Sequence, residues 1–487
     1  MSYLDLSILE MHEAIISGKV TPLELVTEAI SRAKADNNNA FEYICEKEAL
    51  EAVASLDETK KNNLLWGIPY ALKDNFSTKD IPTTASSNIL NGYKPIFSSE
   101  VYNRLNAAGA IMIGKTTLDE LAMGGTGTTG HLGKTFNPWD PEHLHQIGGS
   151  SCGSAAACAA SIVPFAIGSD TGDSVRKPAS HAALVGFKPT WGRISRFGLF
   201  PFAPSMDHVG FFTRNVKDSA IVLEALSGRD FKDSTSSTVD VEQYSENINS
   251  DLKGKKIAVI KEISESISNK EIKSSFENLL KKMEAAGAVI SYVSIDVNLL
   301  KAIYPTYIVI SCCEATSNNA NLDGIKFGPR FDADNYEGVM SKSRTSGFSE
   351  LIKRRFIIGS FSLLRENREE TFEKAQKCRR VIVNETNKIL EDNDGILLPA
   401  SPTVAPLFAS ASGDKLSNEY LIADNWMAIG NFGGLPSITI PMGFENGLPF
   451  GVNLTCKKFS ESETLSIASG IENITGLAGI SAKKEGK

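Results

Sequence analysis

The spacing of apolar residues predicts a helix that begins near residue 22. Thr21, Pro22 and Glu24 combine a capping hydroxyl, a proline at the first helical position and the glutamate of a capping box. Val26 and Ile30 follow at helical spacing, so that one face of the segment is apolar. We therefore expect residues 1–60 to form an N-terminal helical segment.

Short apolar runs, each long enough for one strand, follow this segment and alternate with helical patterns. The runs are IPYALKD, AIMIGKT before Thr117-Leu118-Asp119-Glu120, PFAIGSD, and KKIAVIKE before the amphipathic EIKSSFENLLKKMEAAG. Strands that alternate with helices are typical of an α/β protein with a largely parallel sheet. We expect a large, twisted, mixed and mostly parallel sheet with helices on both faces.

The stretch at 228–250 is polar, rich in serine and without periodicity, which indicates a surface connection. Apolar strands recur beyond it, in GILLPAS and SITIPMGF, so we expect the sheet to take strands from both halves of the chain. The expected organisation is one large domain at 61–475 and a C-terminal tail at 476–487.

Composition and charge exclude several classes of protein. The chain has 487 residues, of which 42% are hydrophobic and 22% charged, as in globular proteins. Its net charge is −8 and it has no long basic run that could follow a phosphate backbone. The N-terminus is acidic and amphipathic, unlike a signal peptide, and no stretch reaches transmembrane length. We expect a cytoplasmic protein that contacts neither a membrane nor, directly, RNA.

Cysteine and histidine usage predicts no metal site. The seven cysteines are scattered without a CxxC pair and are expected to be reduced, mostly buried thiols. Of the six histidines only His143 and His145 lie close together in sequence, and no cysteine or histidine stands at zinc-finger spacing to them.

Two turns rich in glycine and serine are candidates for chemistry. The first opens IGGSSCGSAAACAAS at 147–161, where unbroken small residues allow close approach of backbone. The second follows the strand that ends near Ser169 and offers Ser174 at a sharp exit. Successive N–H groups in such a turn can hold a developing oxyanion. The alternatives are a tightly packed helix and an ordinary turn.

Lys73 is a candidate base because it ends the apolar strand IPYALKD. Burial would lower the pKa of its amine, since the charged form loses water, and a neutral amine near pH 7 can accept a proton. The alternative is a lysine whose charged end reaches solvent.

These motifs occur together in a known family: the chain resembles the amidase signature family, and within it the A subunits of tRNA-dependent amidotransferases. The resemblance runs from about residue 5 to residue 475. It rests on the segments GIPYALKDN, NPW, GGSSCGSAAA, GSDTGDSVRKPAS, GFKPTWGRISRFGLFPFAPSMDHVGFFTR, DGIKFG and GNFGGLPSITIP. It implies the α/β amidase signature fold.

The resemblance also implies a Ser–Ser–Lys triad. Lys73 matches the base, Ser150 the serine that relays the proton, and Ser174 the nucleophile. A cis peptide bond is implied before the relay serine. The implied oxyanion hole consists of the N–H groups of Thr171, Gly172, Asp173 and Ser174, and the implied supporting residues are Ser151 and Asp170.

The implied substrate is glutamine, whose α-carboxylate and α-ammonium call for a guanidinium and a carboxylate. Arg355 matches the first, Asp424 the second, and Tyr307 would line the pocket. The implied partners are the B and C subunits of an amidotransferase that converts Glu-tRNA(Gln) to Gln-tRNA(Gln), with tRNA contacted mainly through a partner. The resemblance implies that the chain needs no cofactor of its own, so ATP and Mg²⁺ are expected on a partner protein.

Three positions depart from the family pattern. Asp173 stands where a second glycine is common, Gly127 where an acidic residue is usual, and Cys152 replaces a glycine. Three other functions stay open: a free-standing amidase that acts on small amides with the same triad, a catalytically silent assembly subunit, suggested by Asp173, and Ser–His–Asp hydrolysis that uses Asp207 and His208.

Overall fold

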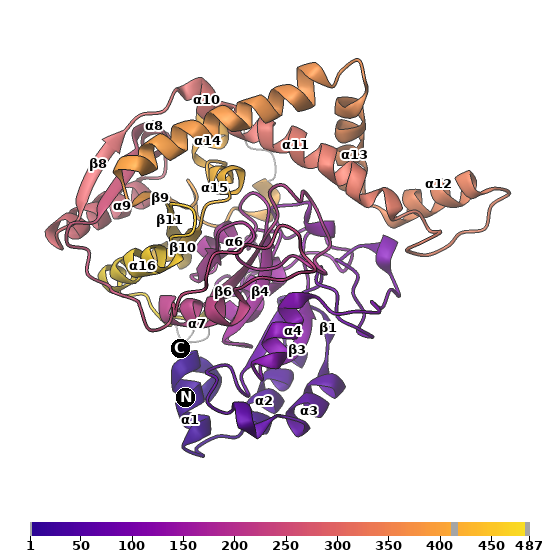
Figure 1. Ribbon diagram of the computed structural model, residues 1–487, viewed down its shortest axis with the longest axis horizontal. Helices are drawn as coiled ribbons and strands as arrows, with labels where there is room; N and C mark the ends of the chain where they lie inside the picture. Colours follow the sequence, from indigo (N-terminus) through magenta and orange to yellow (C-terminus); the bar gives the residue numbers. More distant parts are fainter. Residues whose placement is uncertain (1, 411–416, 483–487) are drawn as a thin grey trace.

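The computed structural model describes residues 2–410 and 417–482 and is built around one mixed sheet of eleven strands (Figure 1). The strand order is β1-β3-β2-β4-β6-β5-β10-β11-β9-β7-β8. The strands are β1 (Phe41–Ile44), β2 (Pro69–Lys73), β3 (Ile111–Thr116), β4 (Phe165–Asp170), β5 (Val185–Lys188), β6 (His208–Thr213), β7 (Lys256–Ile260), β8 (Val289–Val293), β9 (Gly395–Pro399), β10 (Ser437–Glu445) and β11 (Leu448–Cys456).

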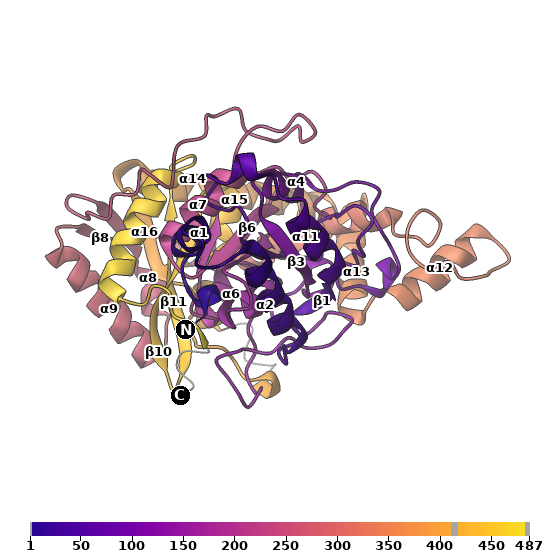
Figure 2. The same cartoon turned by 90° about the horizontal axis from the view of Figure 1, so that it is seen from below.

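Helices surround this sheet, and α16 lies against β10 and β11 (Figure 2). They are α1 (Ile8–Ile16), α2 (Pro22–Lys34), α3 (Glu46–Ala54), α4 (Glu100–Ala107), α5 (Cys152–Ala159), α6 (Arg176–His181), α7 (Val216–Leu226), α8 (Lys261–Glu265), α9 (Lys270–Ala285), α10 (Val297–Lys301), α11 (Ile303–Asn318), α12 (Tyr336–Gly347), α13 (Glu350–Leu363), α14 (Lys374–Asp392), α15 (Ala428–Gly433) and α16 (Glu461–Thr475). Helix α12 extends away from the rest of the molecule (Figure 1). No helix among the described residues is long and apolar enough to cross a membrane.

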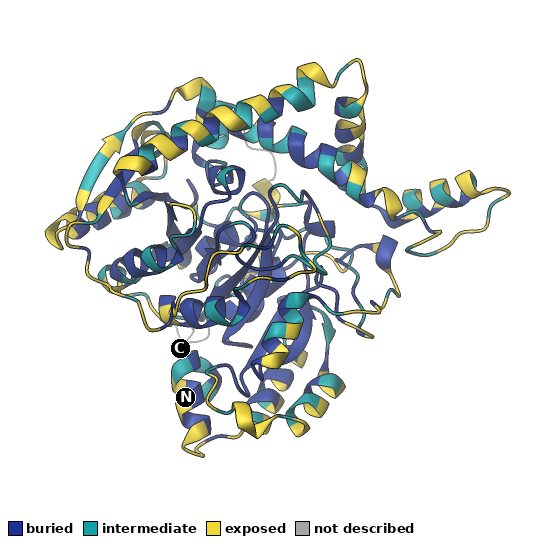
Figure 3. Cartoon of the chain, in the orientation of Figure 1, coloured by how far each residue is buried: buried dark blue, intermediate teal, exposed yellow. Residues whose placement is uncertain are grey.

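The predicted α/β sheet and several of its elements are confirmed. Helix α2 begins at Pro22, and Thr21 and Glu24 form the predicted capping box. Every residue of β2, β3, β4, β5, β6 and β9 is buried. Because successive side chains of a strand point to opposite faces, these strands are covered on both sides (Figure 3).

The expectation of a mostly parallel sheet is wrong. Of the ten pairings between the described strands, four are parallel and six antiparallel. Parallel pairs lie toward the two ends of the sheet, whereas β4, β6, β5, β10, β11 and β9 form a continuous antiparallel centre. A tight turn at Asn446 and Gly447, both with positive φ, joins β10 to β11 as a hairpin and so forces the antiparallel direction.

The helix expected after β3, from Thr117-Leu118-Asp119-Glu120, does not form. The segment forms a single short turn, η4 (Glu120–Ala122), in which Leu121 and Ala122 have positive φ. The carboxylate of Asp119 accepts hydrogen bonds from the N–H groups of residues 126–129 instead of capping a helix. Those contacts fold the chain back on itself after β3.

Both sides of the polar stretch at 228–250 contribute to the one sheet, and no helix or strand lies between Leu226 and Lys256. Residues 1–60 contribute β1 as well as helices. The division into an N-terminal segment, a domain at 61–475 and a tail at 476–487 stays a prediction, and residues 483–487 of that tail lie outside the described part.

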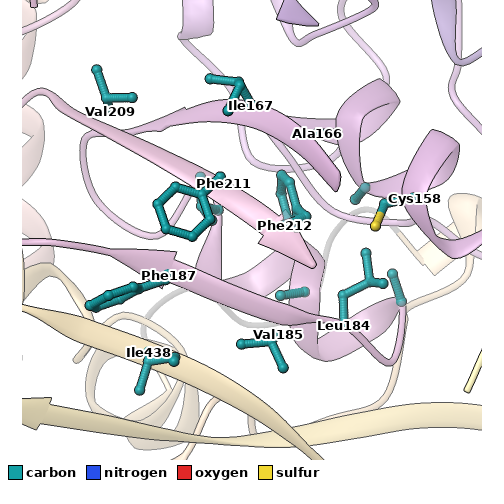
Figure 4. Close-up of a cluster of buried hydrophobic side chains, with 14 of the residues drawn as sticks. Cys158, Ala166, Ile167, Leu184, Val185, Phe187, Val209, Phe211, Phe212 and Ile438 are labelled. Atoms are coloured by element: carbon teal, nitrogen blue, oxygen red, sulfur yellow. The ribbon is translucent and has the colours of Figure 1, made fainter. Parts of the chain in front are cut away.

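The core at the centre of the sheet is formed by aromatic and branched side chains. Phe187 and Phe211 are fully buried on the neighbouring strands β5 and β6, with ring centroids 5.8 Å apart and an edge-to-face arrangement. Ile167 of β4 and Ile438 of β10 lie in the same cluster (Figure 4). This packing fixes the end of β4, from which the second glycine-serine turn leaves.

Candidate active site

The side chain of Lys73 ends in a fully buried cage of hydroxyl groups. Lys73 is the last residue of β2, between β3 and β4, and has no exposed surface. Its Nζ lies 2.8 Å from Oγ of Ser150 and 2.9 Å from Oγ of both Ser151 and Ser169. The alternative of a lysine whose charged end reaches solvent is therefore wrong.

This environment changes the acidity of the amine. Burial lowers the pKa of Lys73 to about 7, although Cys152 and the carboxylates of Asp119, Asp170 and Asp207 partly oppose the change. Among the described residues no carboxylate contacts Nζ directly, since its partners there are hydroxyls and the Ser169 carbonyl oxygen, at 3.4 Å. A large fraction of the amine is thus neutral near pH 7 and able to accept a proton.

Ser150 is held in place by the turn before α5. The peptide bond between Gly149 and Ser150 is cis, as the resemblance implies. The N–H of Asp119 donates to the carbonyl oxygen of Ser150 at 3.1 Å. A Cβ on Gly149 would lie 1.9 Å from Oδ2 of Asp119, so only glycine fits against this carboxylate.

Small residues after Ser150 let α5 lie close to the strands. All residues of α5 are buried, and a Cβ on Gly153 would lie 2.4 Å from both the Ala40 carbonyl oxygen and Oγ1 of Thr117. The turn that carries Ser150 thus leads directly into a tightly packed helix. Its packing places the Ser150 hydroxyl at Lys73.

The second turn, residues 171–174, presents unpaired hydrogen-bond donors. Within the described part of the chain, the backbone N–H groups of Thr171, Gly172, Asp173 and Ser174 donate to no other group. The Ser174 hydroxyl likewise has no hydrogen-bond partner there, and the residue is 3% exposed. Four neighbouring N–H groups beside a free hydroxyl are the arrangement that an oxyanion hole and its nucleophile require.

A buried ion pair fixes the shape of this turn. Asp170 and Arg176 have no exposed surface, and Nη2 of Arg176 lies 2.9 Å from Oδ1 of Asp170. Burial raises the pKa of Asp170, but the Arg176 guanidinium and further donors outweigh burial and hold it well below its usual value. Arg176 also donates to the Gly172 carbonyl oxygen at 2.7 Å and to Oδ1 of Asn431 at 2.6 Å.

Arg176, Ser169 and Asn431 also hold the site, and none of them is among the site residues predicted from the sequence. Arg176 lies in the recognised segment GSDTGDSVRKPAS, so its closeness to Asp170 in sequence was the available signal. Asn431 reaches the turn from 255 residues beyond Arg176, and no local pattern could have shown that contact.

The carboxylate of Asp173 forms an ion pair next to the turn. Its Oδ2 lies 2.8 Å from Nζ of Lys177, and the same Nζ lies 3.2 Å from Oδ1 of Asp424. The structure therefore brings Asp173 and the predicted substrate-binding Asp424 together through Lys177, which is not among the residues predicted from the sequence.

Tyr307 and Arg355 reach the same region from α11 and α13. A Cβ on Gly172 would lie 3.0 Å from the Tyr307 ring, so that ring packs directly on the turn. Tyr307 stands edge-on to Phe202 with centroids 6.5 Å apart, and the Arg355 guanidinium lies 5.5 Å from the Phe202 ring centre. Nε and Nη1 of Arg355 are buried without a hydrogen-bond partner in the described residues, whereas Arg354 is exposed. Arg355 is thus available to an anion.

A cavity of about 30 Å³ lies at the turn and is lined by Gly172, Asp173, Tyr304, Tyr307, Asn425 and Ala428. This volume is close to that of one water molecule. A larger substrate therefore requires movement of a lining side chain.

The structure does not assemble a triad from Asp207 and His208. His208 is buried in β6, with Nδ1 2.6 Å from the Met206 carbonyl oxygen and Nε2 without a partner in the described residues. Asp207 instead accepts a hydrogen bond from Oγ1 of Thr171 at 2.7 Å and so supports the turn at 171–174.

Gly127 and Cys152, two of the departures from the family pattern, are neighbours in space. A Cβ on Gly127 would lie 2.9 Å from Cβ of Cys152, so a larger residue at one position requires a small one at the other. Burial raises the pKa of the Cys152 thiol to about 12, which keeps it neutral. The pair is therefore a packing change beside Lys73.

No group of three or more histidine, cysteine, aspartate or glutamate side chains in residues 2–410 and 417–482 is arranged to hold a metal ion. His131 contacts Glu42 and His145 contacts Asp140 instead.

Comparison with known proteins places this site in a family. The family model described as Amidase matches residues 24–465. The chain belongs to the amidase family. It is 40% identical over 476 residues to the A subunit of the glutamyl-tRNA(Gln) amidotransferase of Macrococcus caseolyticus, covering 97% of each chain. It is 39% identical over 483 residues to the corresponding A subunit of Halalkalibacterium halodurans, covering 98% of each.

A solved amidase-family structure shares the whole fold. The crystal structure of the A subunit of the glutamyl-tRNA(Gln) amidotransferase from Thermotoga maritima matches with a TM-score of 0.79 and 35% identity, over 97% of this chain and 95% of that one. The predicted amidase signature fold is confirmed.

Replacement of Asp170 by asparagine tests whether the buried ion pair holds the turn. Asp170→Asn leaves the Arg176 guanidinium buried without its counter-charge, so we expect the free energy of unfolding to fall by about 3–5 kcal/mol in urea denaturation. Glu350→Gln removes an exposed partner of Lys353 and should change the free energy of unfolding by less than about 0.5 kcal/mol. Equal stability of the two variants would contradict the role given to Asp170.

Proposed function

We propose that this chain is the glutaminase subunit of a tRNA-dependent amidotransferase and hydrolyses glutamine with Lys73, Ser150 and Ser174. The observation that carries the proposal is the buried Nζ of Lys73, 2.8 Å from Oγ of Ser150. The free N–H groups of the turn at 171–174 and the full-length similarity to amidotransferase A subunits support it.

In the proposed mechanism, Lys73 acts as the base through Ser150. The neutral amine accepts the Ser150 proton, Ser150 accepts the proton of Ser174, and Ser174 Oγ attacks the side-chain amide carbon of glutamine. The N–H groups of Thr171, Gly172, Asp173 and Ser174 stabilise the negative oxygen, at roughly 10²–10³ in rate per donor.

Collapse of this intermediate breaks the carbon–nitrogen bond. The leaving nitrogen takes a proton back along Lys73 and Ser150 and departs as ammonia, which leaves a glutamyl ester on Ser174. Water, deprotonated by the same groups, then attacks the ester and releases glutamate. In this scheme Ser151 and Asp170 are supporting residues: Ser151 holds Lys73, and Asp170 holds the turn through Arg176.

Recognition of glutamine rests on the residues around the same turn. The two unpaired guanidinium nitrogens of Arg355 suit the α-carboxylate, Asp424 suits the α-ammonium, and Tyr307 forms the wall against Gly172. A free-standing amidase that acts on neutral amides has no use for two buried guanidinium nitrogens that lack a hydrogen-bond partner among the described residues. The Lys177 contact of Asp173 keeps its carboxylate engaged beside the turn and weakens the case for a silent subunit.

The remaining steps require partners. Ammonia would pass to a B subunit that carries ATP and Mg²⁺ and activates glutamate on Glu-tRNA(Gln), in a heterotrimer with a C subunit. The net charge of −8 supports the assignment of tRNA to the partners. The GxxxxGKT pattern at 109–116 runs into the buried strand β3 and not into a loop that opens a helix, so it forms no phosphate-binding loop, and ATP is assigned to a partner as well. Protein biosynthesis of this kind places the complex in the cytoplasm.

Ser174→Ala should abolish ammonia release from glutamine, with a loss of at least about 10³-fold, because no other hydroxyl occupies the nucleophile position. Wild-type enzyme should prefer glutamine to benzamide, since benzamide offers nothing to Arg355. Ammonia from both amides is quantified with a coupled dehydrogenase. Preference for benzamide would favour the free-standing amidase, and full activity of Ser174→Ala in the assembled complex would favour the silent subunit.

Co-expression with B and C subunits should give a complex that converts misacylated Glu-tRNA(Gln) to Gln-tRNA(Gln) with glutamine as nitrogen donor. In Ser174→Ala complex, added ammonium chloride should restore the conversion, because only ammonia production is lost. Conversion is followed by release and chromatography of the labelled amino acid. Failure of wild-type complex to use glutamine while it uses ammonium would contradict the proposal.

The kcat/KM for glutamine should rise with pH to a plateau, with an apparent pKa near 7, because only the neutral Lys73 amine accepts a proton. Well below pH 7 the amine is charged, and the rate should fall about tenfold per pH unit. Steady-state ammonia release from pH 5 to pH 9 measures the profile. A rate independent of pH across pH 7 would remove Lys73 as the base.

A further inference from the structure

Asp173, Lys177 and Asp424 form a charged group that we call the carboxylate–lysine cluster. Nζ of Lys177 lies 2.8 Å from Oδ2 of Asp173 and 3.2 Å from Oδ1 of Asp424. The side chains of Lys177, Asp173 and Asp424 are 11%, 23% and 26% exposed, so the cluster is only partly in contact with solvent. It therefore acts in a medium where charges are weakly screened.

The cluster borders the cavity at the oxyanion turn. Asp173 lines this cavity together with Gly172, Tyr307 and Asn425. Nζ of Lys177 also donates to the carbonyl oxygen of Asp424 at 3.0 Å, so Lys177 ties the segment that bears Asn425 to α6. A substrate at Ser174 therefore lies next to the cluster.

The charges of the cluster do not cancel. Burial lowers the pKa of Lys177, but the two carboxylates outweigh burial and raise it above the usual range, so the lysine stays cationic. Burial raises the pKa of the Asp173 carboxyl, and its 2.8 Å contact with the Lys177 ammonium opposes that rise. With both carboxyls ionised, one ammonium and two carboxylates give a net charge of −1. One further ammonium group would bring the net charge of the cluster to zero, and the α-ammonium of an amino-acid substrate is such a group.

We propose that Asp173 is a specificity-determining residue: it shares Lys177 with Asp424, so that the cluster keeps a negative charge for the ammonium group of the amide substrate. The inference rests on the proposed function and adds Asp173 and Lys177 to it. Without the Asp173 carboxylate, Lys177 and Asp424 form a neutral pair. An incoming ammonium must then compete with Lys177 for Asp424 and is repelled by it.

The test compares glutamine with glutaramate, which has the same amide and carboxylate but no amino group. In the assembled enzyme, Asp173→Asn keeps the backbone N–H of the turn and removes only the charge. We expect the KM for glutamine to rise by about tenfold, the value of one partly buried charge contact. The KM for glutaramate should stay the same or fall, because glutaramate has no ammonium to place.

Removal of the competing lysine should reverse the effect. The double variant Asp173→Asn/Lys177→Met leaves Asp424 unpaired, so the KM for glutamine should return to within about threefold of wild type. Lys255→Met, which breaks an ion pair with Glu463 that is also partly exposed, serves as the control and should leave both KM values unchanged. Rescue by a second substitution distinguishes this role from damage to the turn, which would lower kcat for both substrates.

Where wild-type enzyme releases ammonia from glutamine, two outcomes overturn the inference alone. One is an equal change in the KM for glutamine and for glutaramate in Asp173→Asn, and the other is a double variant in which the KM for glutamine does not recover. Wild-type complex that releases no ammonia from glutamine would overturn the proposed function itself, and the inference with it. The two failures are therefore distinguishable in one set of assays.

Discussion

The amino group of Lys73 lies in the interior among hydroxyl groups, where its charge is poorly compensated. Lys73 has no exposed surface, and hydroxyls at 2.8–2.9 Å accept hydrogen bonds from the amine but carry no full negative charge. Burial therefore lowers the pKa of Lys73 to about 7. A more exposed position would keep the lysine protonated, and a carboxylate in direct contact would do the same. The proposed chemistry depends on this balance.

The rest of the site holds two turns in fixed shapes, and one of them lies against that amine. One turn carries Ser150 and is fixed by Asp119, whose carboxylate excludes any residue larger than glycine at 149. The other carries Ser174 and is fixed by Asp170 and Arg176, both without exposed surface. The four free N–H groups of that turn depend on this support, because a flexible loop would turn them toward its own carbonyl groups.

Local features of the chain could be predicted because their causes are local. The capping box of α2 and the apolar run of β2 depend on neighbours within a few residues, and both are confirmed. Lys73 and the glycine-serine turns could be recognised as motifs for the same reason, and the family resemblance added the roles of Ser150 and Ser174. The antiparallel centre was missed because pairing direction depends on which strands meet. Likewise, the contact of Arg176 with Asn431 joins residues 255 apart, and no spacing in the sequence indicates it.

Two lysines near the turn at 171–174 have pKa values that are shifted in opposite directions. Burial acts on both in the same direction, since it lowers the pKa of Lys73 and of Lys177. The difference lies in the contacts: Lys73 meets hydroxyls, whereas Lys177 meets the carboxylates of Asp173 and Asp424 and has its pKa raised. A carboxylate at 173 is therefore compatible with the lowered pKa of Lys73, because Asp173 forms its ion pair with Lys177 instead.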